Sequence, residues 1–337
     1  MDVSALRQRL EHHPQTLPFT LPNLQPRITR QKVDLALAWE QQASRHFLIC
    51  RDDPLYPPLL KQIADAPMVL FVKGQPELLL HPAIAVVGSR AASHGGINLA
   101  FQLASQLDAA GLAVVSGMAA GIDGAAHKGS LSQSGKTIAV LGTGVEQIYP
   151  KKHRSLYEDI QQHGALVSEF WPDVTAFAGN FPKRNRIISG LALGTLVVEA
   201  RRRSGSLISA RTAMEQGREV FAIPGSVISG DHQGCHDLIK NGAKLVENLS
   251  DIVEELPPLL QSHLQALPDC TVLPTTGNSQ LPFKTLLASV GYETTPLDVV
   301  VEQSGITLDL VLEQLLELEL QGWVAAVPGG YVRLKRS

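Results

Sequence analysis

Six short apolar runs between residues 84 and 245 alternate with stretches of helical periodicity, and each run ends in a turn rich in glycine, serine or arginine. The runs lack the apolar/polar alternation of half-exposed strands, so they predict strands that are buried on both faces. Strands of this kind form a parallel sheet with helices on both sides, a doubly wound α/β fold. The predicted strands are 84–87, 112–115, 137–141, 165–167, 195–198 and 220–223.

The turns that follow these strands carry most of the unusual polar residues. The carboxyl ends of parallel strands meet at one edge of the sheet, where helix N-termini offer unpaired N–H groups and a positive dipole. The sequence therefore predicts a ligand site at this edge. Its turns contain Gly88, Ser89, Arg90 and Gly117, a segment that runs on to Arg186, and the residues from Arg201 to Ser206.

Charge indicates the class of ligand. Residues 183–218 hold eight basic against two acidic side chains, a local net charge of +6, whereas the whole chain carries −3. Arginines that solvate helix ends are the alternative explanation for such a cluster. Because these bases fall on two adjacent turns of the predicted binding edge, with Arg90 on a third, we expect a site for a polyanion.

Composition sets limits on the class of protein. A chain of 337 residues with 44% hydrophobic content can build one large core and one or two small modules. Cys50, Cys235 and Cys270 are too widely spaced for a typical zinc site or disulfide framework. No signal peptide is evident and no apolar run approaches the roughly 20 residues of a membrane span, so we expect a cytoplasmic protein.

Four zones follow one another along the chain. Residues 1–50 predict a short, partly helical appendage, and residues 51–256 form the main domain, in which 68–74 is a strand that extends the sheet. A proline-rich linker is expected over 257–282. Residues 283–337 predict three helices and two strands, the outline of a small winged-helix-like module.

The predicted C-terminal module is acidic. Residues 285–332 contain no lysine or arginine but seven acidic side chains, and the predicted recognition helix bears Asp309, Glu313 and Glu317 among them. Such a helix would repel phosphate. We therefore expect this module to contact protein or to pack within the fold, in place of binding duplex DNA.

Familiar cofactor and metal motifs are incomplete. The triplet 135–137 ends like a P-loop but precedes a strand, and 142–147 begins like a dinucleotide fingerprint but lacks the third glycine. We expect no nucleotide cofactor. Asp123 and His127 have helical spacing, but no further ligand completes a metal site, so we expect His127 to hydrogen-bond to Asp123 or to a neighbouring loop. Glu199, at a strand end among arginines, is open to either a structural or a catalytic role.

Four ordered segments, 85–90, 115–127, 181–191 and 199–206, resemble the DNA processing protein A family (DprA, also called Smf). The resemblance covers about residues 53–255. It implies an extended Rossmann-like core that binds single-stranded DNA during natural transformation, protects it and hands it to the RecA recombinase. It also implies homodimers, a C-terminal winged-helix-like module and a small N-terminal helical domain, which is short in this sequence.

The residues and the resemblance together give candidate roles at the binding edge. We expect the basic side chains to pair with phosphates, while Gly117 and Gly205 let the DNA backbone approach closely. The loop aromatics Phe170, Trp171, Phe177 and Phe181 could stack on bases or belong to the core. The predicted DNA-binding residues are Gly88, Ser89, Arg90, Gly117, Lys183, Arg184, Asn185, Arg186, Arg201, Ser204, Gly205 and Ser206.

An enzyme is the competing class. Residues 189–199 loosely resemble the glycine-rich signature of nucleoside-monophosphate phosphoribohydrolases, in which an arginine and a glutamate cleave an N-glycosidic bond. The chain lacks the Pro-Gly-Gly opening of that signature and has an extra residue between Thr195 and Glu199. We therefore assign no catalytic residue and expect a binding protein.

Overall fold

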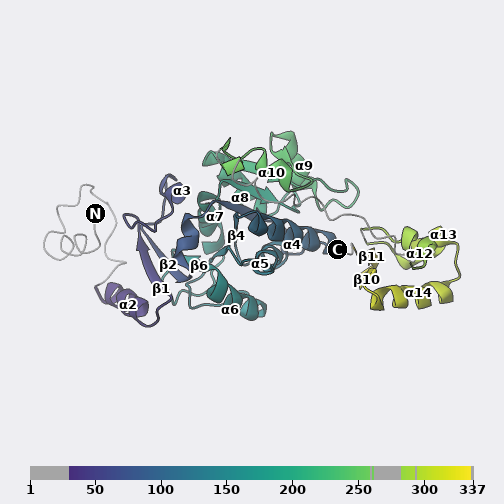
Figure 1. Ribbon diagram of the computed structural model, residues 1–337, viewed down its shortest axis with the longest axis horizontal. Coiled ribbons are helices and arrows are strands. Elements are labelled where there is room, and N and C mark those ends of the chain that lie inside the picture. Colours follow the sequence, from purple (N-terminus) through teal and green to yellow (C-terminus); the bar gives the residue numbers. More distant parts are fainter. Residues whose placement is uncertain (1–29, 259, 262–281, 293, 335–337) are drawn as a thin grey trace. The chain divides into compact units, whose positions relative to one another are not determined.

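The computed structural model describes residues 30–258, 260–261, 282–292 and 294–334. These residues form a large unit, drawn chiefly from the chain up to residue 261, and a small C-terminal unit that begins at 282 (Figure 1). The proline-rich segment 1–29 and nearly all of the predicted linker 257–282 lie outside the described residues.

A nine-stranded sheet forms the centre of the large unit, in the order β1-β2-β6-β5-β4-β3-β7-β8-β9. The seven strands from β3 to β9 run parallel to one another, as predicted, and β1 and β2 add an antiparallel edge. The strands are β1 (His46–Cys50), β2 (Val69–Gly74), β3 (Ala83–Val87), β4 (Ala113–Ser116), β5 (Thr137–Val140), β6 (Ala165–Ser168), β7 (Gly194–Val197), β8 (Glu219–Ala222) and β9 (Lys244–Leu245).

Helices cover both faces of the sheet, which confirms the doubly wound prediction. On β3, Ala85 and Val87 pack in the core that holds α7, α8 and α9, whereas Ile84 and Val86 pack against α4, α5 and α10. No helix in the described part of the chain is long and apolar enough to cross a membrane. The helices are α2 (Arg30–Gln41), α3 (Pro58–Lys61), η2 (Pro76–Leu80), α4 (His94–Ala109), α5 (Ile122–Leu131), η3 (Lys151–His153), α6 (Arg154–His163), α7 (Asn180–Leu191), α8 (Ser206–Glu215), α9 (Gln233–Lys240) and α10 (Leu249–Val253).

The strand order reverses beside β3. After β3 the chain adds β4, β5 and β6 on one side, and it then returns to place β7 on the other side of β3. Consequently, the loops after β3 and β7 lead to helices on opposite faces of the sheet, α4 on one face and α8 on the other. A crevice at such a switch point is where open α/β sheets bind their ligands.

The N-terminal region takes part in the main sheet. The predicted helix of this region is present as α2, but the strand β1 that follows it was not predicted, and it pairs with β2 along its whole length. The prediction that residues 68–74 extend the sheet is confirmed by β2. Residues 46–50, assigned from sequence to an appendage, therefore supply an edge strand.

The small unit has the predicted helices and two-stranded wing. Its helices enclose a core that includes Leu286, Leu287, Val311, Leu315 and Val324. A winged-helix-like module is thus confirmed. Its elements are α12 (Lys284–Ser289), α13 (Leu297–Ser304), α14 (Leu308–Leu320), β10 (Val324–Val327) and β11 (Gly330–Arg333).

Candidate nucleic-acid interface

The loop after β3 is held close to the loop after β7 and to the start of α5. The amide of Ser89 donates to the carbonyl of Glu199 at 2.8 Å, and the amide of Ile122 donates to the carbonyl of Ser89 at 3.2 Å. A Cβ on Gly88 would lie 2.5 Å from the side chain of Ile122, so glycine is needed there for close packing. This packing fixes the loop and leaves the side chain of Arg90 exposed.

A pocket of about 90 Å³ lies beside Arg90 at the carboxyl edge of the sheet, and we call it the switch-point pocket. The guanidinium of Arg90 lies 5.5 Å from the ring centre of Phe181, and the ring of Tyr149 lies 5.4 Å from the same ring. Met118 and Arg184 also line the pocket. It thus combines an exposed cation with two aromatic rings, the pair of features that binds single-stranded nucleic acid without sequence preference.

Arg184 has a structural role that the sequence did not reveal. Its side chain is buried, at 4% exposure, and it donates to the carbonyls of Gly117, at 2.6 Å, and of Val140. Burial lowers the pKa of Arg184 to about 10, although the nearby Asp123 opposes this shift. Arg184 therefore braces the loop after β4, a structural role, and its expected pairing with phosphate stays a prediction that its burial makes less favourable.

Gly117 is explained by the same contact. A Cβ at this position would lie 2.7 Å from the guanidinium of Arg184. Glycine here makes room for a buried arginine, and because Gly117 also lines the switch-point pocket, its close approach to a ligand stays a prediction. Gly205 differs, because the space where its Cβ would lie is open.

The remaining bases of the 183–186 cluster lie on helix α7, where a turn was expected. Lys183 is exposed, and Asn185 is partly buried with its side-chain oxygen 3.3 Å from Nε of Arg184. Arg186 forms ion pairs with Asp65, at 2.9 Å, and with Glu169. Burial raises the pKa of Glu169, and the charge of Arg186 opposes that shift. Lys183 is therefore the cation of this cluster that is most open to a ligand.

The arginine-rich loop after β7 is exposed and leads into α8. Arg201 pairs with Asp231 at 2.6 Å and Arg202 with Asp237 at 3.1 Å, yet both side chains remain mostly exposed, at 74% and 67%. The hydroxyls of Ser204 and Ser206 are 2.7 Å apart at the N-terminus of the helix. An anion here would meet these hydroxyls and the positive end of the α8 dipole.

Asp123 and His127 do not hydrogen-bond to each other, which was one of the two arrangements expected for His127. Asp123 accepts hydrogen bonds from the amides of Gly117, at 3.1 Å, and Ala119, at 3.3 Å, whereas Nδ1 of His127 lies 2.7 Å from the hydroxyl of Thr137. Burial lowers the pKa of His127 to about 3, so the imidazole is neutral at physiological pH. Across the described residues, no group of three His, Cys, Asp or Glu side chains is placed to hold a metal ion.

The loop aromatics divide between core and surface. Trp171 packs against Phe71 with ring centres 5.7 Å apart, whereas Phe177 is 67% exposed and Phe181 lines the switch-point pocket. Tyr149 was missed from sequence. The signal for it was a Tyr-Pro pair shortly after the glycine-rich turn that ends β5.

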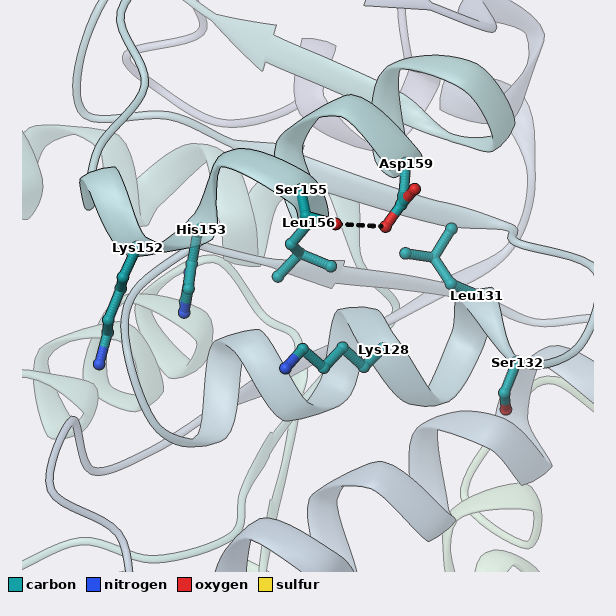
Figure 2. Close-up of a pocket in the computed structure, with 8 residues that line it drawn as sticks. All are labelled: Lys128, Leu131, Ser132, Lys152, His153, Ser155, Leu156 and Asp159. Atoms are coloured by element: carbon teal, nitrogen blue, oxygen red, sulfur yellow. Dashed lines mark hydrogen bonds between the residues drawn. The ribbon is translucent and has the colours of Figure 1, made fainter.

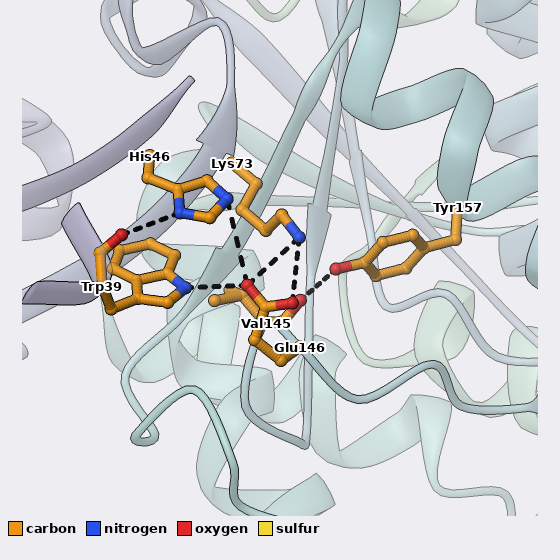
Figure 3. A network of polar contacts seen from close by, with 6 residues as sticks. All are labelled: Trp39, His46, Lys73, Val145, Glu146 and Tyr157. Atoms are coloured by element: carbon orange, nitrogen blue, oxygen red, sulfur yellow. Dashed lines mark hydrogen bonds and ion pairs between the residues drawn. The ribbon is translucent and has the colours of Figure 1, made fainter. Parts of the chain in front are cut away.

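A polar network anchors the loop that carries Tyr149 (Figure 3). Glu146, on this loop, accepts from the indole of Trp39 at 2.7 Å and pairs at 3.2 Å with Lys73, a lysine that is only 7% exposed. The hydroxyl of Tyr157 donates to the carbonyl of Val145, and burial raises its pKa. Residues of α2, β2 and α6 thus hold the wall of the pocket in place.

The fold and site define a Rossmann-like protein with an electropositive binding edge, and the comparisons identify its family. The family model for DNA recombination-mediator protein A matches residues 47–257, and that for the DprA winged helix domain matches 275–330. The chain belongs to the DNA processing protein A (DprA/Smf) family.

Relatives match most of the chain. Protein Smf of Escherichia coli K12 is 49% identical over 313 residues, which cover 91% of this chain and 82% of the relative. DNA processing protein DprA of Streptococcus pneumoniae R6 is 48% identical over 203 residues, which cover 60% of this chain and 72% of the relative.

Two solved structures share the fold. The structure of DNA processing protein A from Streptococcus pneumoniae has a TM-score of 0.62 at 46% identity, and the match covers 66% of this chain and 78% of that one. The Helicobacter pylori protein, whose structure is described for its unique single-stranded DNA binding mode, has a TM-score of 0.55 at 27% identity, with 63% of this chain and 94% of that one covered.

Proposed function

We propose that this protein binds single-stranded DNA across the carboxyl edge of its sheet. The observation that carries the proposal is the switch-point pocket, in which Arg90 lies beside the rings of Phe181 and Tyr149. Arginine pairs with phosphate, and aromatic rings stack on any base, so such a site holds a strand independently of its sequence. The DNA-binding mode described for the Helicobacter pylori relative supports the same ligand.

The exposure of each basic side chain indicates which of them can contact the DNA strand. Arg90 and Lys183 are free to pair with phosphates, and the loop with Ser204, Gly205 and Ser206 offers hydroxyls and a helix N-terminus. Arg201 contributes by exchanging Asp231 for a phosphate, which its high exposure permits. Arg186 and Arg184 support DNA binding indirectly. The ion pair of Arg186 with Asp65 holds α7 in position, and the hydrogen bond of Arg184 to the carbonyl of Gly117 holds the loop after β4.

We further propose the cellular role that family membership suggests: the protein protects incoming single strands in the cytoplasm during natural transformation and loads the RecA recombinase on them. A homodimer is part of this proposal. In support of it, strand β9 ends the sheet and Leu245 on this strand is 40% exposed, so among the described residues this edge could pair with a second copy. The relatives named DNA processing protein DprA support the DNA-processing role.

A titration with single-stranded and duplex DNA over a range of salt concentrations tests the binding proposal. With about four phosphate contacts, the logarithm of the single-strand affinity should fall with the logarithm of salt concentration at a slope near −3. We expect the single strand to bind more tightly than the duplex. Equal affinity for the duplex would contradict a pocket built for unstacked bases.

The enzyme alternative has a direct assay. Glu199, its candidate catalytic acid, is only 1% exposed, which is unfavourable for contact with a substrate. We expect no free base after incubation with nucleoside monophosphates. Release of base that stops in a Glu199→Gln variant would establish the phosphoribohydrolase activity instead.

A further inference from the structure

A second hollow lies between α5 and α6, outside the switch-point pocket (Figure 2). Its volume is about 380 Å³, and we call it the α5–α6 groove. Lys128, Lys152 and His153 gather at one end of the groove, whereas Asp159 lies towards the other end, where the hydroxyl of Ser155 is 3.5 Å from its carboxylate. The groove therefore has a basic end and an acidic end.

The basic end carries two available cations. Lys128 and Lys152 are exposed, and neither ammonium forms an ion pair with another described residue. Burial lowers the pKa of His153, whose Nδ1 lies 3.1 Å from the carbonyl of Met118, so the charge at neutral pH comes from the lysines. The N-terminus of α6, with Arg154 as its first residue, adds the positive end of a helix dipole.

The basic end adjoins the switch-point pocket along the chain. Tyr149 and Pro150 line the pocket, and Lys152 and His153 line the groove. Three residues of backbone extend at most roughly 11 Å, so Lys152 lies within a few nucleotides' reach of the pocket. Met118 connects the two sites as well, because it lines the pocket and its carbonyl oxygen is within hydrogen-bond distance of Nδ1 of His153.

We propose that the α5–α6 groove is a second phosphate-binding subsite, in which Lys128 and Lys152 bind the backbone of a DNA strand that continues beyond the switch-point pocket. This inference rests on the proposed function, which supplies the strand. None of the described residues that line the groove is a phenylalanine, tyrosine or tryptophan, and its one ring, the imidazole of His153, is partly buried, so the groove offers mainly phosphate contacts. It should therefore add affinity only for strands long enough to reach it.

Oligothymidylates of about 4 to 16 nucleotides test this length dependence. The double variant Lys128→Ala/Lys152→Ala should bind the shortest oligomer as the unsubstituted protein does. For the longest oligomer, its affinity should fall roughly 10- to 25-fold near 0.1 M salt, and the salt slope should flatten by about 1.4. Lys128→Arg/Lys152→Arg keeps both charges and should retain most of the affinity.

Lys61→Ala is the matched control, because Lys61 is an exposed lysine on α3, outside both cavities. Thermal melting should be the same for all variants, since the substituted side chains are exposed. An unchanged affinity and slope for the long oligomer would overturn the subsite, and so would an equal loss for short and long oligomers. Failure of the unsubstituted protein to bind any oligomer would refute the proposed function itself, and the subsite with it.

Discussion

Replacement of Arg90 by alanine removes the exposed cation of the switch-point pocket with little effect on the fold. The guanidinium contacts the ring of Phe181 at 5.5 Å, and a cation–π contact at an exposed site contributes about 0.5–1 kcal/mol. Its larger role is with DNA. One lost phosphate contact should flatten the salt slope by about 0.7, which near 0.1 M salt is roughly a fivefold loss of affinity, or about 1 kcal/mol.

Fluorescence anisotropy of a labelled oligothymidylate, measured across salt concentrations, gives both the affinity and the slope. The loss should be similar for oligomers of different sequence, because a phosphate contact positions a strand without reading it. Arg90→Lys is the matched control: it keeps the charge, so its slope should stay near that of the unsubstituted protein. An unchanged affinity and slope in a folded Arg90→Ala protein would remove Arg90 from the site.

Four further outcomes are expected. Arg184→Met should lower the free energy of unfolding by about 3 kcal/mol or more, because it leaves the carboxylate of Asp123 and the carbonyls of Gly117 and Val140 without their buried cationic partner. A urea midpoint equal to that of the unsubstituted protein would refute this bracing role. His127 has a folded pKa of about 3 against an ordinary value of 6.5, so the stability from its neutral ring is present above pH 6.5 and is lost as pH falls towards 3, by at most about 1.36 kcal/mol per pH unit. Denaturation of His127→Gln across this range should show a weaker pH dependence, and an identical dependence would exclude His127 as its source. Neither EDTA nor ATP should alter DNA binding, since the motifs for metal and nucleotide are incomplete; a chelator-sensitive affinity would contradict this. Truncation after residue 281 should leave the affinity for single-stranded DNA within a few-fold of that of the intact chain, because α14 exposes acidic residues and leucines, with Leu320 81% exposed. Any loss should instead appear in assembly or in binding to a protein partner. A loss of affinity of around a hundredfold, or about 2.7 kcal/mol, in a folded truncated protein would show that the module belongs to the DNA site.

The sheet was predictable because burial on both faces leaves a continuous apolar run in each parallel strand. The turns that follow these runs lie at the carboxyl ends of the strands, so they also indicate the binding edge. Strand β1 was missed because it is only five residues long and lies in the zone that was assigned to an appendage, shortly after α2. The start of α7 was missed for a different reason. The bases at 183–186 were assigned to a turn, but Pro182 is tolerated in the first turn of a helix, and α7 begins two residues before it, at Asn180.

The roles of individual site residues were less predictable, because residue type does not determine burial. Arg90, on the loop after β3, and Arg184, on α7, are the same residue type, yet the side chain of Arg90 is exposed whereas that of Arg184 is buried, at 4% exposure. The difference arises from long-range contacts, such as those of Arg184 with Gly117 and Val140. Tyr149 likewise reaches the pocket only because Glu146 and its distant partners anchor the loop.

A crystal structure of the protein with a short oligothymidylate tests the central claim most directly. We expect a thymine ring against Phe181 or Tyr149, with an adjacent phosphate paired to Arg90. A strand bound away from the switch-point pocket, with both rings free of bases and Arg90 free of phosphate, would contradict the account.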